Sequence, residues 1–264
     1  MSSPSAPFYI HPDWQKSFQA NRLNNFDDLW ELELELADAG NRGRGEGGWS
    51  RVGFYSLPES PSASPKIVVK KQQNYLIRTW RQPVRGMLTF VKEFNMFQRI
   101  ASLGIPVPQV VYCATRRQGN HHQAILVTAW LEGYEPLDKI LDCWQRCRPD
   151  RVERARLLRP VAETVGQLHQ NRLAHRCLYP KHLFVDTNQP QPRCCLIDLE
   201  KTRWSPWRAN LRCRDLAQLV RHTENFPRRD AVVFLRAYLG RETLGAEGKK
   251  LWRAVHRQIK RKTH

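Results

Sequence analysis

Residues 173–186 read Leu-Ala-His-Arg-Cys-Leu-Tyr-Pro-Lys-His-Leu-Phe-Val-Asp, and residues 194–200 read Cys-Cys-Leu-Ile-Asp-Leu-Glu. In the first segment a His-Arg turn leads into a short apolar run that ends at Asp186. The residues between the two segments are rich in Pro and Gln, which predicts a reversal of the chain. The second apolar run ends at Asp198. The sequence therefore predicts a hairpin of two short strands that places a carboxylate at the end of its second strand.

A short strand is predicted at residues 66–71, which read Lys-Ile-Val-Val-Lys-Lys. Its β-branched centre favours a strand. Successive side chains of a strand point to opposite faces of a sheet, so Lys70 and Lys71 serve different faces. A solvated basic strand end is the alternative that the residues leave open.

An amphipathic helix is predicted at residues 88–100, where Phe90, Phe94 and Phe97 recur at helical spacing. Glu93 lies three residues after Phe90 and four before Phe97, at the buried edge of this apolar stripe. A glutamate there either pairs with a cation of another element or lies at the surface beside a basic neighbour. The spacing alone does not decide between the two.

A glycine-rich segment lies within residues 41–52, directly before a β-like run at residues 52–57. Gly45, Gly47 and Gly48 allow positive φ angles, and they let backbone N–H groups approach a phosphate closely. A nucleotide-covering loop has this composition. An ordinary Gly/Arg hairpin has it too.

The order of the elements predicts an α+β fold. Five strands are expected in the first half, at the end of a helix-to-strand segment and in four further runs: 26–36, 52–57, 66–71, 109–115 and 123–130. From about residue 140 onward the apolar spacing is helical. The expected organisation is an N-terminal extension, a first lobe and a second lobe: residues 1–26, 27–132 and 133–264.

The composition favours anionic partners. Lys and Arg number 43 against 25 Asp and Glu, which gives a formal net charge of +18 and a pI near 10.1. No run of 18 apolar residues and no signal-like N-terminus is present, so we expect a cytoplasmic protein. The seven cysteines show no Cys-x-x-Cys spacing, which favours free thiols over disulfides or a zinc site.

Several phrases of the chain resemble the lipopolysaccharide kinase family (Kdo and heptose kinases, WaaP-like), and within it the InaA-type branch. They span roughly residues 40–225 and are Gly47–Ser50, Lys70–Tyr75, Gly104–Pro108, His175–His182 and Ile197–Lys201. The resemblance rests on the ensemble rather than on one phrase. It implies a two-lobed, protein-kinase-like fold with a five-stranded antiparallel N-lobe that carries one main helix, and a mostly helical C-lobe.

The resemblance implies ATP and Mg²⁺ as cofactors. Lys70, chosen over Lys71 because the two point to opposite faces, would neutralise the nucleotide phosphates, and Glu93 would orient Lys70. Asp198 would hold the metal between the phosphates, with His182 at the position where protein kinases place a metal-binding Asn.

The resemblance also implies nucleotide contacts from two further segments of the chain. Gly45, Gly47 and Gly48 would close over the phosphates. The backbone groups of Trp130 and Leu131, in the segment that would join the lobes, would bind the adenine.

The chain departs from the family pattern at Cys177, which stands where such kinases carry the catalytic Asp of His-Arg-Asp. His175 and Arg176 complete that motif, and the sequence does not show which residue would act as base. Asp215 matches a structural Asp of the family, so we assign it to the scaffold.

Two functions follow from this pattern. One is ATP-dependent phosphoryl transfer to a core sugar of an anionic glycolipid such as lipopolysaccharide. The other is a pseudokinase or nucleotide-binding regulatory protein with weak or no transfer. Peripheral association with the inner membrane is open, and no nucleic-acid partner is expected because no helix-turn-helix, zinc finger or RNA-binding aromatic motif is present.

Overall fold

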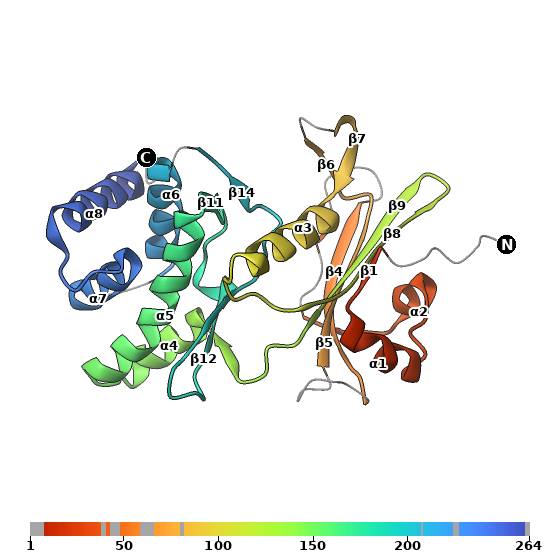
Figure 1. Cartoon of the computed structure of the whole chain (residues 1–264), viewed down its shortest axis with the longest axis horizontal. Helices are drawn as coiled ribbons and strands as arrows, with labels where there is room; N and C mark the ends of the chain where they lie inside the picture. Colours follow the sequence, from red (N-terminus) through yellow and green to blue (C-terminus); the bar gives the residue numbers. More distant parts are fainter. Residues whose placement is uncertain are drawn as a thin grey trace. The chain divides into compact units, whose positions relative to one another are not determined.

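The computed structural model describes residues 8–37, 41–42, 48–58, 66–79, 82–206, 208–223 and 227–261. The chain divides into two compact units (Figure 1). Unit 1 comprises Met1–Arg99 and Pro108–Glu132, and unit 2 comprises Ile100–Val107 and Gly133–His264. None of the helices in the described ranges is long and apolar enough to span a bilayer.

Unit 1 is built on a seven-stranded antiparallel sheet with the order β1-β8-β9-β5-β4-β2, in which β3 also pairs with β4. Its strands are β1 (Tyr9–Ile10), β2 (Glu35–Leu36), β3 (Asn41–Arg42), β4 (Trp49–Ser56), β5 (Lys66–Gln73), β8 (Val110–Gln118) and β9 (His121–Ala129). A separate hairpin consists of β6 (Leu76–Thr79) and β7 (Gln82–Leu88). All five predicted strands are in the sheet, but the described residues of unit 1 form more strands than the five predicted. Strands β1 and β3 have two residues each, too few to show the alternation on which prediction depends. The hairpin of β6 and β7 was not predicted either.

The N-terminal segment is part of the core of unit 1. A 3-10 turn (Pro12–Trp14) is followed by α1 (Gln15–Ala20) and α2 (Phe26–Glu31), and α2 leads into β2 as predicted. Their buried side chains pack with those of the sheet in one cluster: Trp14, Phe18, Leu23, Phe26, Leu29, Leu57, Ile67, Val69, Val111, Tyr112, Ala114, Ile125 and Val127. Removing these apolar groups from water stabilises the sheet and the helices together.

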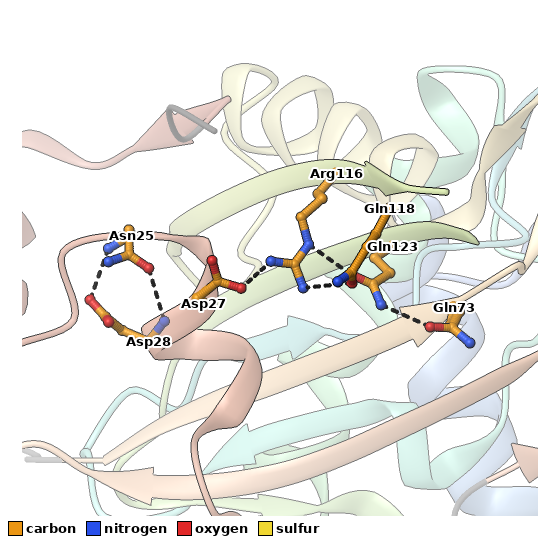
Figure 2. A network of polar contacts seen from close by, with 7 residues as sticks. All are labelled: Asn25, Asp27, Asp28, Gln73, Arg116, Gln118 and Gln123. Atoms are coloured by element: carbon orange, nitrogen blue, oxygen red, sulfur yellow. Dashed lines mark hydrogen bonds and ion pairs between the residues drawn. The ribbon is translucent and has the colours of Figure 1, made fainter. Parts of the chain in front are cut away.

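Arg116 of β8 attaches α2 to the sheet (Figure 2). Its guanidinium forms an ion pair with Asp27, donates to Gln123 Oε1 at 2.8 Å and lies 4.4 Å from the centroid of the Phe26 ring. One planar cation therefore contacts a carboxylate, an amide and an aromatic face, which Lys could not do with the same geometry.

Lys71 of β5 faces the same N-terminal helices. Its Nζ donates to the carbonyl oxygens of Trp30 and Leu32, at 2.7 Å each, where α2 ends. An ammonium group near the last carbonyls of a helix is favourable. Burial nevertheless lowers the pKa of Lys71 from 10.5 to about 8.

We predict that Lys71 makes the stability of the fold depend on pH. Because its folded pKa lies below its unfolded value, the unfolded chain binds more protons between pH 8 and 10.5, and stability rises with pH in that window. Urea unfolding should show the wild type gaining up to about 3 kcal/mol relative to Lys71→Met between pH 7 and pH 10.5. Lys16→Met, at an exposed position, controls for the loss of one charge. A constant difference between the wild type and Lys71→Met across this range would contradict the prediction.

The helix α3 (Thr89–Ser102) starts in unit 1, as the apolar spacing of residues 88–100 predicted. Unit 2 is mostly helical, with a three-stranded sheet of order β10-β12-β13 and a two-stranded pair, β11 and β14. Its helices are α4 (Leu137–Arg146), α5 (Arg151–Gln170), α6 (Arg208–Arg221), α7 (Arg228–Leu239) and α8 (Gly245–Lys260). Its strands are β10 (Tyr134–Pro136), β11 (Leu173–Ala174), β12 (Leu183–Asp186), β13 (Cys194–Leu196) and β14 (Arg203–Trp204).

The predicted hairpin before Asp198 is confirmed. β12 and β13 are antiparallel, with Leu183 opposite Leu196 and Val185 opposite Cys194. Behind them, α5 packs closely on α7 at Gly166, where an added Cβ would lie 2.7 Å from the Tyr238 carbonyl oxygen. Unit 2 thus holds the segment that carries Asp198 against a tightly packed helical core.

Candidate functional site

Lys70 and Glu93 form an ion pair inside unit 1. Lys70 Nζ donates to Glu93 Oε1 at 2.7 Å, and the Glu93 side chain is 1% exposed. An unpaired carboxylate at that depth would be strongly destabilising, so the lysine ammonium is held close to it. The two predicted partners are thus in contact, on strand β5 and helix α3.

A second hydrogen bond sets the position of α3 on β5. Thr89 Oγ1 donates to Gln72 Oε1 at 2.6 Å, and both side chains are buried. Gln72 lies two residues after Lys70 on the strand, and Thr89 lies four residues before Glu93 on the helix, so both contacts use the same two faces. Lys70 and Lys71 therefore serve opposite faces of the sheet.

Asp198 and His182 lie together in unit 2. Asp198 follows β13 with a φ of +57°, and its side chain is 37% exposed. His182 Nδ1 lies 2.8 Å from the carbonyl oxygen of Cys177, an acceptor, so Nδ1 carries the proton in this network. The other ring nitrogen, Nε2, lies 3.4 Å from Asp198 Oδ2. In a neutral imidazole this nitrogen carries a lone pair, so it and the carboxylate are both metal-ligand atoms.

Asp215 of α6 fixes the turn that carries the His-Arg-Cys motif. Its carboxylate accepts the backbone N–H groups of His175 at 2.7 Å and Arg176 at 2.9 Å, and it lies 3.1 Å from His169 Nε2. Arg176 has a φ of +67°, which costs about 1–2 kcal/mol for a non-glycine residue. These hydrogen bonds stabilise that backbone conformation. Burial alone would raise the pKa of Asp215, but the hydrogen bonds and neighbouring histidines, His169 first, lower the pKa overall.

His175 points into the interior of unit 2. Its Nε2 donates to the Ile197 carbonyl oxygen at 2.9 Å, one residue before Asp198, and its Nδ1 is buried without a hydrogen-bond partner in the described structure. Burial lowers the pKa of His175, so the ring is neutral at neutral pH. The imidazole therefore ties the motif turn to the segment that carries Asp198.

The Lipopolysaccharide kinase (Kdo/WaaP) family matches residues 27–238 of this chain. The chain belongs to this family. It is similar to Protein InaA of Escherichia coli (strain K12), with 27% identity over 213 residues that cover 79% of this chain and 93% of that protein. The resemblance to the InaA-type branch is thereby confirmed.

The fold is also similar to that of a solved structure. The structure described as WaaP in complex with acyl carrier protein aligns with a TM-score of 0.64 at 21% identity, covering 96% of this chain and 98% of that one. At this identity the likeness establishes the fold, with its mixture of helices and antiparallel sheets, and leaves the reaction to be argued from the residues.

Cys177, which the sequence predicts to stand at the Asp position of the kinase motif, is 7% exposed. Burial raises the pKa of its thiol, although the nearby charge of Lys201 acts in the opposite direction. The thiol is therefore protonated at neutral pH and is a poor proton acceptor. Lys201 also shares a hydrogen bond with Cys177, so a cation stands beside this thiol.

The other residues predicted to bind nucleotide lie in the glycine-rich segment and at Trp130 and Leu131. Gly45 and Gly47 lie outside the described residues, and Gly48 is described directly before β4. The backbone N–H of Trp130 donates to the Lys66 carbonyl oxygen at 3.2 Å, and Leu131 is the next residue.

Sequence reasoning missed the roles of His169 and Lys201. His169 supports Asp215 from α5, with its Nδ1 2.8 Å from the Tyr238 hydroxyl oxygen. Its position four residues after Val165 on the apolar face of a predicted helix was the available signal. Lys201 lies three residues after Asp198, but its contact with Cys177 joins two different loops. No sequence pattern near either residue predicts such a contact.

The donor atoms fit a divalent cation that also binds phosphate. Among the described residues no group of three or more His, Cys, Asp or Glu side chains is arranged for a metal. A dedicated protein cage is thus absent from the described part of the chain. Mg²⁺ is commonly bound by one or two carboxylates together with substrate phosphates and water, which one carboxylate such as Asp198 satisfies. Imidazole is a softer ligand and suits transition metals better than Mg²⁺.

We predict that Asp215 is required for folding stability. Asp215→Ala leaves two buried backbone N–H groups without their acceptor and should cost about 3–5 kcal/mol in chemical denaturation at pH 7. Asp215→Asn retains one acceptor oxygen and should cost less. Because the folded pKa is depressed, this stability is present above the unfolded pKa, close to 3.8, and is lost as the pH falls through the folded pKa.

Asp142→Asn, at an exposed position on α4, is the matched control for the loss of a charge. Equal stabilities of Asp215→Ala and Asp142→Asn would contradict the assigned role of Asp215.

Proposed function

We propose that the protein is an ATP-dependent phosphotransferase of the lipopolysaccharide kinase type, which transfers phosphate to a sugar hydroxyl of an anionic glycolipid core. Membership of the family supports this reaction class. The observation that carries the proposal is the ion pair of Lys70 and Glu93 at 2.7 Å, because protein kinases use a strand lysine paired with a helix glutamate to bind nucleotide phosphates.

In this proposal Lys70 neutralises charge on the α and β phosphates of ATP. The Lys70 side chain is 16% exposed, in contrast to 1% for Glu93, so the ammonium is the accessible member of the pair. Glu93 is a positioning residue, since it acts through Lys70. A lysine held in one orientation loses less conformational entropy when it binds a phosphate.

Asp198 is the proposed metal ligand, and His182 its neighbour. Bound Mg²⁺ would neutralise developing charge on the transferred phosphoryl group. The carboxylate of Asp198 is 37% exposed, which leaves it accessible to such an ion, and it lies 3.4 Å from His182 Nε2. His175 would hold this segment through Ile197.

The adenine contact is proposed for the segment that begins at Trp130. Since the Trp130 N–H already donates to Lys66, the Leu131 N–H is the better candidate donor to the base. The Trp130 ring packs edge-on against Phe54, with centroids 5.1 Å apart, and this contact would fix the segment on the sheet. Residues 27–132 and 133–264 are the proposed lobes, with the glycine-rich loop closing over the phosphates.

We expect Lys70→Ala and Asp198→Asn each to weaken metal-dependent ATP binding at least tenfold, because each removes a charge-assisted contact to phosphate or metal. Titration calorimetry with ATP and Mg²⁺ measures this. Glu93→Gln should give a smaller loss, since it removes the positioning charge and leaves the ammonium.

Lys16→Ala controls for net charge, and thermal melts establish that each variant is folded. Unchanged Mg²⁺-dependent binding by folded Asp198→Asn would contradict the proposed metal role.

A nucleotide-binding regulatory function is the second candidate, favoured by Cys177. A buried, protonated thiol beside Lys201 cannot orient an acceptor hydroxyl as a carboxylate does. Positioning and charge neutralisation supply most of the rate in phosphoryl transfer, so the loss of a base slows transfer without removing nucleotide binding.

Replacing Cys177 by Asp discriminates between the two functions. If slow transfer occurs, Cys177→Asp should raise its rate by about 10²–10⁴ with little change in ATP affinity, because it restores the base. The measurement is phosphate incorporation into purified core glycolipid, followed by mass spectrometry. Cys177→Ser is the control and should show no gain.

No phosphate on the glycolipid from either the wild type or Cys177→Asp, with ATP binding intact, would favour the regulatory function and overturn the transferase.

A further inference from the structure

Helix α8 carries a cationic face of unusual regularity. Its exposed Lys and Arg residues are Lys249, Lys250, Arg253, Arg257, Lys260 and, directly after the helix, Arg261. At about 100° per residue, all of them fall within an arc of about 120°. The face extends over about three turns, or roughly 18 Å of helix.

The opposite side of α8 is buried in unit 2. Gly248, Leu251 and Val255 are buried, and α8 packs on α6 and α7 (Figure 1). Glu247 lies outside the cationic arc and pairs with Arg212 and Arg241. The helix is therefore fixed by its apolar side, with the basic side chains directed away from the unit.

The spacing of the positive charges on α8 does not stabilise the helical conformation. Lys249 and Arg253 are four residues apart, and Arg257 and Arg261 repeat that interval, so like charges are neighbours. Residues 248–261 contain no Asp or Glu. On the exposed side of α5, by contrast, Arg156 pairs with Glu153 at 2.7 Å. On α8, neighbouring positive charges therefore repel each other, whereas acidic residues between them would have reduced this repulsion.

We propose that the cationic face of α8 docks the protein on a membrane surface of anionic phospholipid. Clusters of four to eight basic residues on one side of a helix bind such surfaces, because long flexible side chains can reach many phosphate groups of a fluid layer. The choice of a lipid surface rests on the proposed function, since the acceptor there is a membrane-borne glycolipid. Docking by α8 would hold unit 2 at the surface where that acceptor lies.

Nucleic acid is the competing anion for a basic helix. No aromatic residue lies within the arc of the Lys and Arg side chains. At its margin the ring of His256 packs edge-on against the partly buried Trp252, with centroids 4.2 Å apart, so neither ring offers an open face between the charges. Docking on lipid needs only a high density of charge over an area, which the six Lys and Arg residues supply.

The test is co-sedimentation of the full-length protein with vesicles of phosphatidylcholine, with and without phosphatidylglycerol, in the absence of ATP. We expect binding only to the anionic vesicles, with an affinity that falls as salt is added. The triple variant Lys249→Glu, Arg253→Glu and Lys260→Glu should lose roughly 100-fold in partitioning, since each basic residue contributes roughly fivefold.

The matched control changes net charge equally at exposed positions elsewhere: Lys16→Glu, Lys139→Glu and Arg151→Glu. It should lose much less than the α8 variant. A further variant with Gln in place of the same three α8 residues, together with thermal melts, separates loss of docking from loss of folding.

Three results would overturn the proposal. The first is the absence of binding to anionic vesicles by the wild type. The second is an equal loss in the control, which would show that net charge alone is responsible. The third is displacement from vesicles by single-stranded RNA at lower concentration than the lipid, with the same dependence on α8, which would assign the face to nucleic acid. Because these vesicles carry no core sugar and the assay contains no ATP, failure of phosphoryl transfer leaves the docking result intact.

Discussion

A carboxylate buried to 1% exposure at Glu93 constrains the whole of unit 1. Such a charge is tolerated only beside a cation with good geometry, and Lys70 supplies one from the central strand β5. The pairing fixes the helix on one face of the sheet. Since strand geometry then sends Lys71 to the other face, its ammonium meets the end of α2 there. Two adjacent lysines thus hold one helix on each face of the same sheet.

Unit 2 also contains a buried carboxylate, but it is neutralised by different partners. Asp215 is a buried anion whose neutralising partners are backbone N–H groups and a histidine, and it holds the chain at Arg176 in a left-handed conformation. Asp198 has a second left-handed backbone, and His175 contacts the residue before it. Strained backbone at two points of one site persists only where surrounding hydrogen bonds over-determine it. The position of Asp198 is therefore set by the interior of the unit rather than by its own loop.

Local patterns predicted the parts of this arrangement that depend on local geometry. Alternation along β5 separated Lys70 from Lys71, and helical spacing placed Glu93 at a buried edge. The hairpin before Asp198 followed from two apolar runs and a reversal. Strands β1 and β3 were missed because two residues carry no period. The contacts of His169 and Lys201 were missed because they join elements distant in sequence, and the packing of α1 and α2 on the sheet has no local signal either.

The chain combines a thiol at Cys177 with a buried ion pair between Lys70 and Glu93, and the stability of the fold does not by itself explain that ion pair. Replacing both members of a buried ion pair with apolar side chains of similar volume is often neutral or stabilising, by about 1–4 kcal/mol, so stability alone does not explain why a charged pair occupies this position. The carboxylate of Asp198 is partly exposed and lies 3.4 Å from His182. Ligand binding accounts for these charges better than stability does, which supports the proposed binding of a phosphate-bearing ligand. Under that proposal the thiol of Cys177 affects the transfer step rather than the binding step.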